Sequence, residues 1–286
     1  MRASTSRFTH LLLTGFNMRI SGCPGLDPAW LSHRFELFDR FCYPSVRAQS
    51  NQNFKWLVFC DVDTPREFKD RLEAHAEWKG FLPYYTRTLE AYREPVLENI
   101  DGSATHLITT NLDNDDAVAE TFIENVQQQF DGQEFQLVNF PTGLRLRLRR
   151  PKLYAHQVQA NPFLSLIERN DDVTTIRGCG PHNLLESKYD DIRDVESEPL
   201  WLQVVHGRNI AATGIWGCRR VPLSVLDRGF SLRYQHGVGR EGRLAIGLEN
   251  RWRGIERVLI ESVGPRMIQA IRSGLKWKRR SLAKRE

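Results

Sequence analysis

Residues Thr105–Ala117 read THLITTNLDNDDA, an apolar run typical of a buried strand that stops abruptly in three carboxylates. Asp113, Asp115 and Asp116 lie within four positions, and only Asn114 separates them. Like charges this close repel one another, so the pattern predicts a cation nearby. Carboxylate oxygens suit Mg²⁺ or Mn²⁺, which complete their coordination with water and substrate phosphates. We therefore expect the three aspartates to face solvent and to bind a divalent metal that holds a nucleotide diphosphate.

A second interpretation of the same aspartates stays open. Asp is a favoured helix N-cap, and on this interpretation the carboxylates form an acidic loop that caps a helix over residues 116–130. An apolar stripe at helical spacing supports such a helix and consists of Val118, Phe122, Ile123, Val126 and Phe130.

Alternating strand and helix signals surround this stretch. Asp27 and Pro28 are expected to begin one helix, as N-cap and first residue, and Pro44 to end it. A second helix is expected to begin at the capping box Thr64–Glu67 and to run to Trp78. The alternation predicts an α/β fold with a mostly parallel, doubly wound sheet and a C-terminal extension. The strands are predicted over residues 8–17, 54–61, 81–86 and 105–112, the last of them central because it is apolar throughout.

Ligands of open α/β sheets lie beyond the carboxyl ends of the strands. Asp61 and Asp63 end the strand 54–61, and the three aspartates end the strand 105–112, so one crevice is expected to receive both groups. We expect the earlier acids to hydrogen-bond a nucleotide base or ribose while the later acids hold the metal. A role in a turn or a cap remains the alternative for Asp61.

Two further runs carry site candidates. The run GLRLRLRR over 143–150 alternates, which places its leucines on one face of a sheet and its arginines on the other. Either that second face is solvated, or one arginine binds a phosphate or anionic acceptor. The run WLQVVHGRN over 201–209 resembles a strand that ends at His206, which either contacts the metal or a phosphate or packs in the core. Upstream carboxylates are candidates for a general base: Asp190, Asp191, Asp194, Glu196 and Glu198.

Composition bounds the protein class. The chain has 286 residues, of which 41% are hydrophobic, enough for a substantial core. No apolar run approaches the ~20 residues that span a bilayer, and Leu11–Leu13 is too short for a signal-peptide core. We therefore expect a cytoplasmic protein. Its five cysteines are scattered without a C-x-x-C pair, which predicts reduced and mostly buried thiols.

The net charge of +5 is concentrated at the C-terminus. Eight Lys and Arg residues against Glu286 alone give residues 266–286 a charge of +7, which leaves −2 for the rest of the chain. We therefore expect no nucleic-acid partner. The segment is either an amphipathic helix that contacts an anionic membrane, peripherally at the inner face, or a disordered tail. Residues 1–265 are assigned to the folded domain, with a nucleotide-sugar half over 1–140 and an acceptor half over 141–265.

Four segments of the chain resemble a glycosyltransferase of the GT-A type, and more narrowly a bacterial family of rhamnosyltransferases. The resemblance covers roughly residues 10–210, and LDNDDA is its most specific part because it looks like the Asp-x-Asp metal motif of that fold. The segments are HLLLTGFNMR from His10, LFDRFCYPSVRAQSNQNFKWLVFCDVDTP from Leu37, HLITTNLDNDDAVAETFIENVQ from His106, and WLQVVHGRN from Trp201.

This resemblance implies a GT-A-like, Rossmann-like fold and a nucleoside-diphosphate sugar donor. It further implies that Mn²⁺ or Mg²⁺ binds Asp113, Asp115 and Asp116, with His206 as a further metal or phosphate contact. The same resemblance implies that the sugar, with rhamnose as one candidate, is transferred to a glycan or lipid-linked acceptor. It also implies that the transfer proceeds with inversion. An Asp or Glu, among them Asp190, Asp191, Glu196 and Glu198, would deprotonate the acceptor. Donor contacts are implied for Thr14, Asn17, Arg19, Asp61, Asp63, Asp113 and Arg208.

Two rival classes of function stay open. A metal-dependent nucleotidyltransferase or phosphodiesterase uses aspartates in the same way, and a nucleotide-binding or carbohydrate-binding module uses them without turnover. The products separate them. Release of nucleoside diphosphate from a nucleotide-sugar indicates a glycosyltransferase, release of nucleoside monophosphate indicates a diesterase, and no turnover indicates a binding module.

Overall fold

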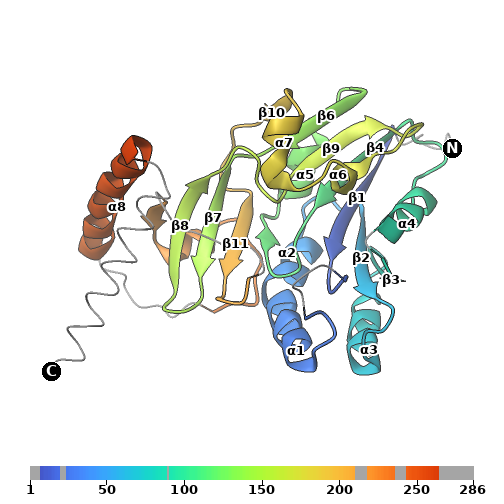
Figure 1. The fold of residues 1–286 in the computed structure, drawn as a ribbon, viewed down its shortest axis with the longest axis horizontal. Helices are drawn as coiled ribbons and strands as arrows, with labels where there is room; N and C mark the ends of the chain where they lie inside the picture. The colour runs from blue at the N-terminus through green and yellow to red at the C-terminus, as the bar shows by residue number, and fades with distance from the viewer. Residues whose placement is uncertain (1–6, 20–23, 89, 210–217, 236–242, 264–286) are drawn as a thin grey trace.

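The computed structural model describes residues 7–19, 24–88, 90–209, 218–235 and 243–263 of the chain. Two sheets make up the fold, one of seven strands and one of five, and they lie side by side in Figure 1. The seven-stranded sheet has the order β10-β6-β9-β4-β1-β2-β3. Four of its six strand pairs are parallel, and β9 runs antiparallel to both of its neighbours. The predicted fold class, α/β with a mostly parallel sheet, is confirmed.

The strands of this sheet are short, and all but the two edge strands are buried over most of their length. β4 is the central strand and is buried over nearly its whole length, as its continuous apolar sequence predicted. The seven strands are β1 (Phe8–Gly15), β2 (Lys55–Asp61), β3 (Phe81–Thr86), β4 (His106–Asn111), β6 (Phe135–Asn139), β9 (Ser165–Arg169) and β10 (Ile192–Asp194).

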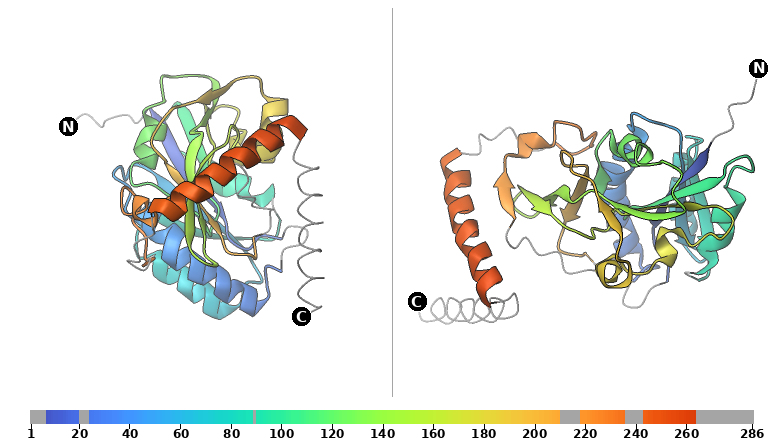
Figure 2. Two further views of the ribbon diagram at one scale, coloured as in Figure 1. Left: turned by 90° about the vertical axis from the view of Figure 1, so that its left-hand side faces the viewer. Right: turned by 90° about the horizontal axis from the view of Figure 1, so that it is seen from above.

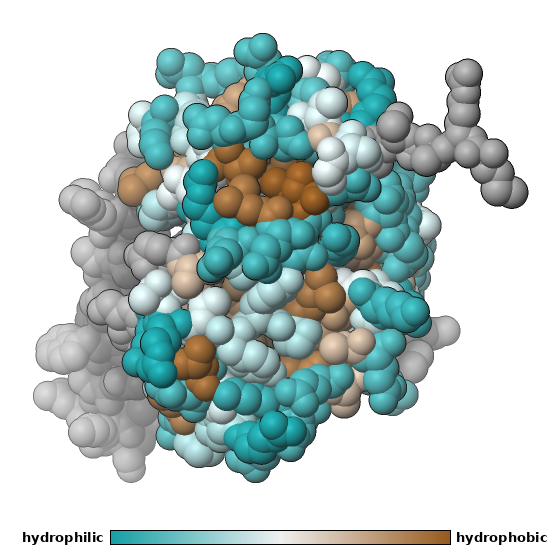
Figure 3. Space-filling model, turned by 90° about the vertical axis from the view of Figure 1, so that its right-hand side faces the viewer, coloured by the Kyte–Doolittle hydropathy of each residue, from teal (hydrophilic) through white to brown (hydrophobic). Residues whose placement is uncertain are grey.

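Helices cover both faces of the seven-stranded sheet, and each face has its own hydrophobic cluster. Buried residues of α1 (Pro28–Leu37), α2 (Tyr43–Arg47), α3 (Arg66–His75) and α5 (Phe122–Gln127) belong to one cluster. Buried residues of α4 (Arg93–Glu98), α6 (Thr175–Gly178) and α7 (His182–Lys188) belong to the other. This two-sided covering is the predicted doubly wound arrangement. Figure 3 shows the side of the molecule that carries α3, α4 and β3, where hydrophilic residues surround smaller hydrophobic patches.

The five-stranded sheet has the order β12-β8-β7-β11-β5. β7 and β11 are parallel, and the other pairs are antiparallel. Its strands are β5 (Ala117–Val118), β7 (Thr142–Arg147), β8 (Lys152–Gln157), β11 (Trp201–Val205) and β12 (Arg219–Val221). The two sheets do not divide at residue 140, because β9 and β10 join the first sheet while β5 joins the second.

A long helix, α8 (Arg243–Val263), packs beside β12 and stands at one end of the molecule in Figure 1 and in the right-hand view of Figure 2. Glu249 holds it there, since its carboxylate binds Lys152 at 2.7 Å, Arg220 at 2.8 Å and the Tyr154 hydroxyl at 3.0 Å. None of the helices in the described ranges is both long and apolar enough to cross a bilayer.

Several predicted helix boundaries are wrong for local reasons. Asp27 does cap α1, because its Oδ1 accepts a 2.7 Å hydrogen bond from the Trp30 amide. Pro44 does not end that helix. A π-helical turn, η1 (Phe38–Cys42), follows α1 and leads directly into α2, where Pro44 occupies a first-turn position that needs no amide proton.

The capping box predicted at Thr64–Glu67 is wrong as well. The Thr64 hydroxyl donates to the Asp61 carbonyl at 2.7 Å instead of capping α3, and the helix begins at Arg66 and ends at His75 rather than Trp78. A short 3-10 turn, η2 (Glu90–Tyr92), precedes α4, and another, η3 (Leu223–Val225), follows β12.

The helix predicted over 116–130 is reduced to α5. Residues 117–118 form β5, and the helix begins only at Phe122, so Asp116 caps no helix. The predicted stripe is nevertheless buried at Val118, Phe122, Ile123 and Val126. The tail expected over 266–286 lies outside the described residues, as does Cys23, while the other four cysteines are buried thiols.

Candidate functional site

Asp115 lies at the centre of a buried charge cluster. It follows β4 in the turn that leads to β5, and only 5% of the residue is exposed. Its Oδ2 binds Nη1 of Arg34 at 2.6 Å and Nε2 of His206 at 2.9 Å. Burial raises the pKa of Asp115, but the His206 hydrogen bond and the Arg34 charge outweigh it and hold this pKa below its usual range. The prediction that this ligand faces solvent is therefore wrong.

Arg34 comes from α1 and was not among the predicted site residues. Its other nitrogen, Nη2, donates to the side-chain oxygen of Asn114, and its guanidinium lies over the Trp30 ring at 5.4 Å. A signal for it exists in the sequence. Arg34 lies three residues after Leu31 and four before Phe38, on the apolar stripe of the helix, where an arginine needs a buried partner.

Asp116 links the two sheets. Its Oδ1 accepts a 2.7 Å hydrogen bond from the Val204 amide of β11, and the adjacent β5 pairs with the start of β11. Burial and the charges of Asp115 and Asp113 raise the pKa of Asp116 well above its ordinary value. The three successive acids therefore have different environments, because Asp113 alone is exposed.

His206 directly follows β11 and lies beside Asp115. Its Nε2 binds Asp115 and its Nδ1 lies 3.1 Å from Nε2 of His33, so both ring nitrogens have protein partners. His33, on α1, was missed by sequence reasoning. Burial and the neighbouring His206 lower the pKa of His33, so this imidazole is neutral at pH 7.

The oxygen atoms left at this site suit a divalent cation. The hydrogen bonds of Asp115 use Oδ2, so its Oδ1 and the exposed Asp113 carboxylate are without partners among the described residues. Mg²⁺ typically takes one or two carboxylates and completes its shell with water and phosphate. No group of three or more acidic, His or Cys side chains in the described ranges has the arrangement of a complete metal site. Metal binding by Asp113, Asp115, Asp116 and His206 stays a prediction.

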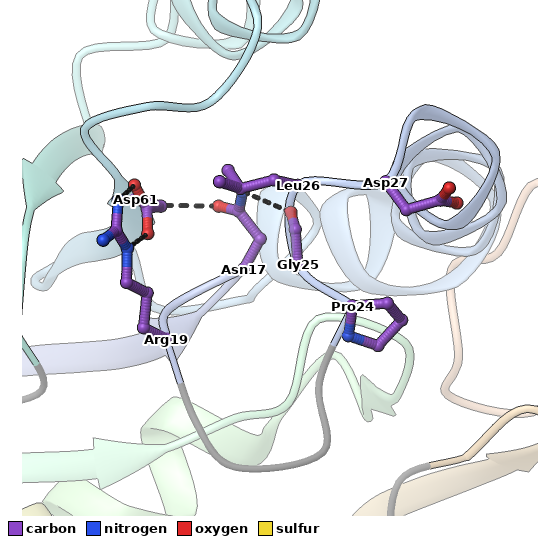
Figure 4. A pocket seen from close by; sticks show the side chains of 7 residues that line it. All are labelled: Asn17, Arg19, Pro24, Gly25, Leu26, Asp27 and Asp61. Atoms are coloured by element: carbon purple, nitrogen blue, oxygen red, sulfur yellow. Dashed lines mark hydrogen bonds and ion pairs between the residues drawn. The ribbon is translucent and has the colours of Figure 1, made fainter.

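A pocket of about 440 Å³ lies at the carboxyl ends of β1 and β2 (Figure 4). Asn17 and Arg19 follow β1, Asp61 ends β2, and all three line the pocket together with the turn before α1. Nδ2 of Asn17 donates to the Gly25 carbonyl at 2.9 Å and to the Thr64 hydroxyl at 2.8 Å. These bonds tie the β1 loop to the start of α1 and to the end of β2.

Arg19 and Asp61 form a two-pronged ion pair in this pocket. Nε and Nη2 of Arg19 each donate to one oxygen of Asp61, and Nη2 also contacts Asp63. Burial raises the pKa of Asp61, but the hydrogen bonds from Arg19 and from the Asp63 amide lower this pKa by more, so the net shift is downward. The carboxyl-edge rule predicted Asp61 and Asp63 at this edge, and the resemblance implied Asn17 and Arg19 as donor contacts. The structure brings all four together, and their role in donor binding stays a prediction.

Thr14 does not fit its predicted role of donor contact. It is fully buried, and its hydroxyl accepts a 2.9 Å hydrogen bond from the Trp56 indole, which makes it a packing residue of β1. Arg208 is exposed just beyond β11, and its charge acts on His33.

The general-base candidates lie away from the aspartate cluster. Asp190 and Asp194 line a pocket of about 320 Å³ at the β10 edge, three strands from β4, and Asp194 accepts a 2.6 Å hydrogen bond from Asn139. Glu196 and Glu198 precede β11, whereas His206 follows it, so the strand separates them. The structure does not bring Asp190, Asp191, Glu196 or Glu198 to the aspartates, and their catalytic role stays a prediction.

The alternating run after Pro141 forms β7 as expected. Leu144 and Leu146 are buried, but the opposite face is not simply solvated, because Arg145 and Arg147 are half-buried there. Burial lowers the pKa of Arg145, and contact with Cys218 opposes this shift. Phosphate binding by one of these arginines stays untested.

Comparisons with known proteins place the chain in one sequence family. Residues 25–216 match a family model described as "Putative rhamnosyl transferase". No curated protein matches the chain in sequence. Among solved structures, Staphylococcus aureus TarS 1–349 is similar with 10% identity and a TM-score of 0.42, over 68% of this chain and 60% of that one. The same fragment in complex with UDP covers 70% and 61%, with 10% identity and a TM-score of 0.42.

A structure described as a "putative nucleotide-diphospho-sugar transferase" from Desulfovibrio desulfuricans G20 is also similar. It has 11% identity and a TM-score of 0.37, over 87% of this chain and 96% of that one. The chain spans about three fifths of the length of the TarS fragment.

Proposed function

Since the chain belongs to the "Putative rhamnosyl transferase" family and is thus a glycosyltransferase, we propose that it transfers a sugar from a nucleoside-diphosphate donor to a glycan or lipid-linked acceptor. One observation carries the proposal. The Asn17–Arg19–Asp61 pocket and the Asp113–Asp115 carboxylates lie at the carboxyl edge of adjacent parallel strands, because β1 is flanked by β2 and β4. This edge is where open α/β sheets bind nucleotides.

In this proposal, the donor binds along the residues that line this edge. The pocket at β1 and β2 receives the nucleoside, and Asp61, kept ionised by Arg19, accepts hydrogen bonds from its ribose or base. The diphosphate then extends toward the end of β4. A divalent ion held there by Asp113 and Oδ1 of Asp115 would act as a Lewis acid on the leaving diphosphate.

The buried cluster behind Asp115 holds this carboxylate in place. Arg34 and His206 both bind Oδ2, which fixes the side chain and directs Oδ1 away from them. Asp116 fixes the next residue through Val204. Such fixed groups need no reorganisation when charge develops on the leaving group, which is how preorganised sites lower a barrier. Inversion at the anomeric carbon and a rhamnosyl donor belong to this proposal.

The acceptor is proposed to reach the enzyme at a membrane surface. On α8 an exposed apolar stripe, Leu244, Leu248, Trp252 and Ile255, recurs at spacings of three and four residues, with exposures of 56–85%. The opposite side of α8 is fixed by Glu249, and the sequence that follows carries +7 over residues 266–286. An apolar stripe beside basic residues is typical of helices that lie on anionic lipid.

Donor turnover tests the function. We expect slow hydrolysis of a nucleotide-sugar to sugar and nucleoside diphosphate in the presence of Mn²⁺, and loss of at least about tenfold in rate for Asp113→Asn. Asp171→Asn is the matched control, because Asp171 is exposed beside Arg169 at the opposite edge of the sheet. Release of nucleoside monophosphate instead would assign the chain to the diesterases, and no turnover of any nucleotide-sugar would leave only a binding role.

A further inference from the structure

A second pocket, of about 390 Å³, opens at the carboxyl end of β4 on the sheet face covered by α6 and α7. Its walls are partly apolar, with Leu164 and Leu185, and its polar groups come from separate elements: Asn111 of β4, Arg177 of α6 and His182 of α7. A few convergent polar groups on an apolar wall are typical of ligand pockets. Because β1 separates β4 from β2, this pocket and the nucleotide pocket lie on opposite sides of β1.

Arg177 brings an unsatisfied positive charge to this pocket. Its Nη2 donates to the Leu13 carbonyl at the end of β1 at 3.3 Å, but its Nε is buried and has no acceptor among the described residues. No carboxylate in the described ranges lies within the 4.0 Å of an ion pair with it. Burial lowers the pKa of Arg177, and the charge of nearby Asp113 opposes that shift. A partly buried guanidinium that has a buried Nε and no ion pair is stabilised when an anion binds it.

The backbone before Arg177 is held in a strained conformation. Thr175 has φ of 65°, which is unfavourable for a β-branched residue. The strain is maintained by several bonds: the amides of Thr174 and Thr175 each donate to the buried Glu168 carboxylate at 2.8 Å, and the Ile176 amide donates to the Thr109 hydroxyl at 2.8 Å. Strain that the surroundings enforce is concentrated at functional sites. Here it fixes the turn that carries Arg177.

Two further residues fit the pocket to an anion. A Cβ on Gly15 would lie 3.3 Å from Nη1 of Arg177, so the guanidinium packs directly over this glycine. His182 lines the same pocket, and its Nδ1 donates to the Ala160 carbonyl at 3.0 Å. Nε2 of His182 is therefore left to contact a ligand.

We propose that the Arg177 pocket binds a phosphate group of the sugar acceptor. The planar guanidinium supplies the two-pronged donor that phosphates favour, and the ring of His182 lines the same pocket. The nucleoside pocket lies at the turn before α1, whose buried residues cover one face of the sheet, whereas this pocket lies on the face covered by α6 and α7, so we assign the anion here to the second substrate. This inference rests on the proposed glycosyl transfer and adds the chemical class of the acceptor: a phosphorylated glycan or a phosphate-bearing lipid carrier.

Titration calorimetry with inorganic phosphate tests the pocket directly. We expect the full chain to bind phosphate, Arg177→Gln to bind it at least about tenfold more weakly, and His182→Gln to be weakened by a smaller factor. Arg169→Gln should bind like the wild type, because Arg169 pairs with the opposite end of β4. His182 is exposed, so its variant reports on the pocket even where the Arg177 variant fails to fold. Absence of phosphate binding by the wild type, or equal binding by all variants, would overturn the proposal.

Competition separates the two sources of a phosphate. Saturating nucleoside diphosphate with Mn²⁺ should leave the phosphate affinity of the wild type unchanged if the pocket serves the acceptor. Displacement of phosphate by nucleoside diphosphate would assign Arg177 to the donor and refute the acceptor assignment. Donor hydrolysis by the wild type reports on glycosyl transfer separately, so a failure of the proposed function and a failure of the phosphate pocket give different results.

Discussion

Replacement of Arg34 by Met should strongly destabilise the protein, because it leaves Asp115 charged and buried. The side chains of Arg34 and Asp115 are only 7% and 8% exposed, and their ion pair measures 2.6 Å. Removal of one partner of such a pair typically costs about 3–5 kcal/mol. His206 still donates to Asp115 in the variant, so we expect a loss near the lower limit, about 3 kcal/mol.

A double-mutant cycle isolates the pair. Asp115→Ala should cost about the same as Arg34→Met, since it leaves a buried guanidinium with only Asn114 as partner. The double variant should cost clearly less than the sum, with a coupling energy of about 2 kcal/mol. Arg66→Met is the control, because the Arg66–Asp70 pair has a similar length, 2.7 Å, but exposures of 77% and 53%. It should change stability by less than about 1 kcal/mol.

Urea unfolding followed by tryptophan fluorescence measures these effects. With a slope of about 2 kcal/mol/M, a loss of 3 kcal/mol lowers the midpoint by about 1.5 M. The reasoning is refuted if Arg34→Met shifts the midpoint no more than Arg66→Met, or if the two single effects add in the double variant. The cycle also bears on the proposed function, since Asp115, the proposed metal ligand, is held by two buried partners and cannot be exchanged without an effect on the fold.

Three further outcomes are expected. Burial lowers the pKa of His10 to about 3, so the unfolded chain takes up the proton first as the pH falls. Stability is therefore lost as the pH falls from about 6.5 toward 3. Between pH 7 and 5 the wild type should lose about 2 kcal/mol more in free energy of unfolding than His10→Gln, measured by urea unfolding. Gly143→Ala should cost about 3 kcal/mol in the same assay, because its Cβ would lie 2.1 Å from the buried Trp201 ring, and a change below about 1 kcal/mol would contradict this contact. Leu248→Ser with Trp252→Ser should weaken sedimentation with anionic vesicles at least about tenfold without lowering the melting temperature, and equal binding by the double variant would exclude α8 from the membrane contact.

Short-range patterns in the sequence predicted the strands well. Apolar runs placed β1, β2, β3 and β4 within a few residues, and the carboxyl-edge rule predicted that Asp61 and the three aspartates lie at the same edge of the sheet. The helix ends failed where tertiary contacts competed with local signals. Thr64 turned its hydroxyl to a strand carbonyl, and Asp116 bound an amide of another strand.

The partners of the aspartates could not be predicted from spacing alone. Arg34 lies 81 residues before Asp115 and pairs with it, and His33 on the same helix contacts His206. The Arg177 pocket needed the structure for the same reason, since it joins β4, α6 and α7. Sequence periodicity describes one element at a time, whereas these contacts depend on how elements cross.

The π-helical turn at Phe38–Cys42 determines where this chain tolerates a change in length. A π turn holds one residue more than an α turn, so loss of one residue there leaves the two flanking helices with the same faces inward. Ser45 and Gln49 would still accept the amides of Val118 and Ile123, and Arg34 would still reach Asp115. A deletion within α1 would instead rotate the preceding residues by about 100°. Related chains whose first helix is one residue shorter are therefore expected to have lost that residue from the π turn.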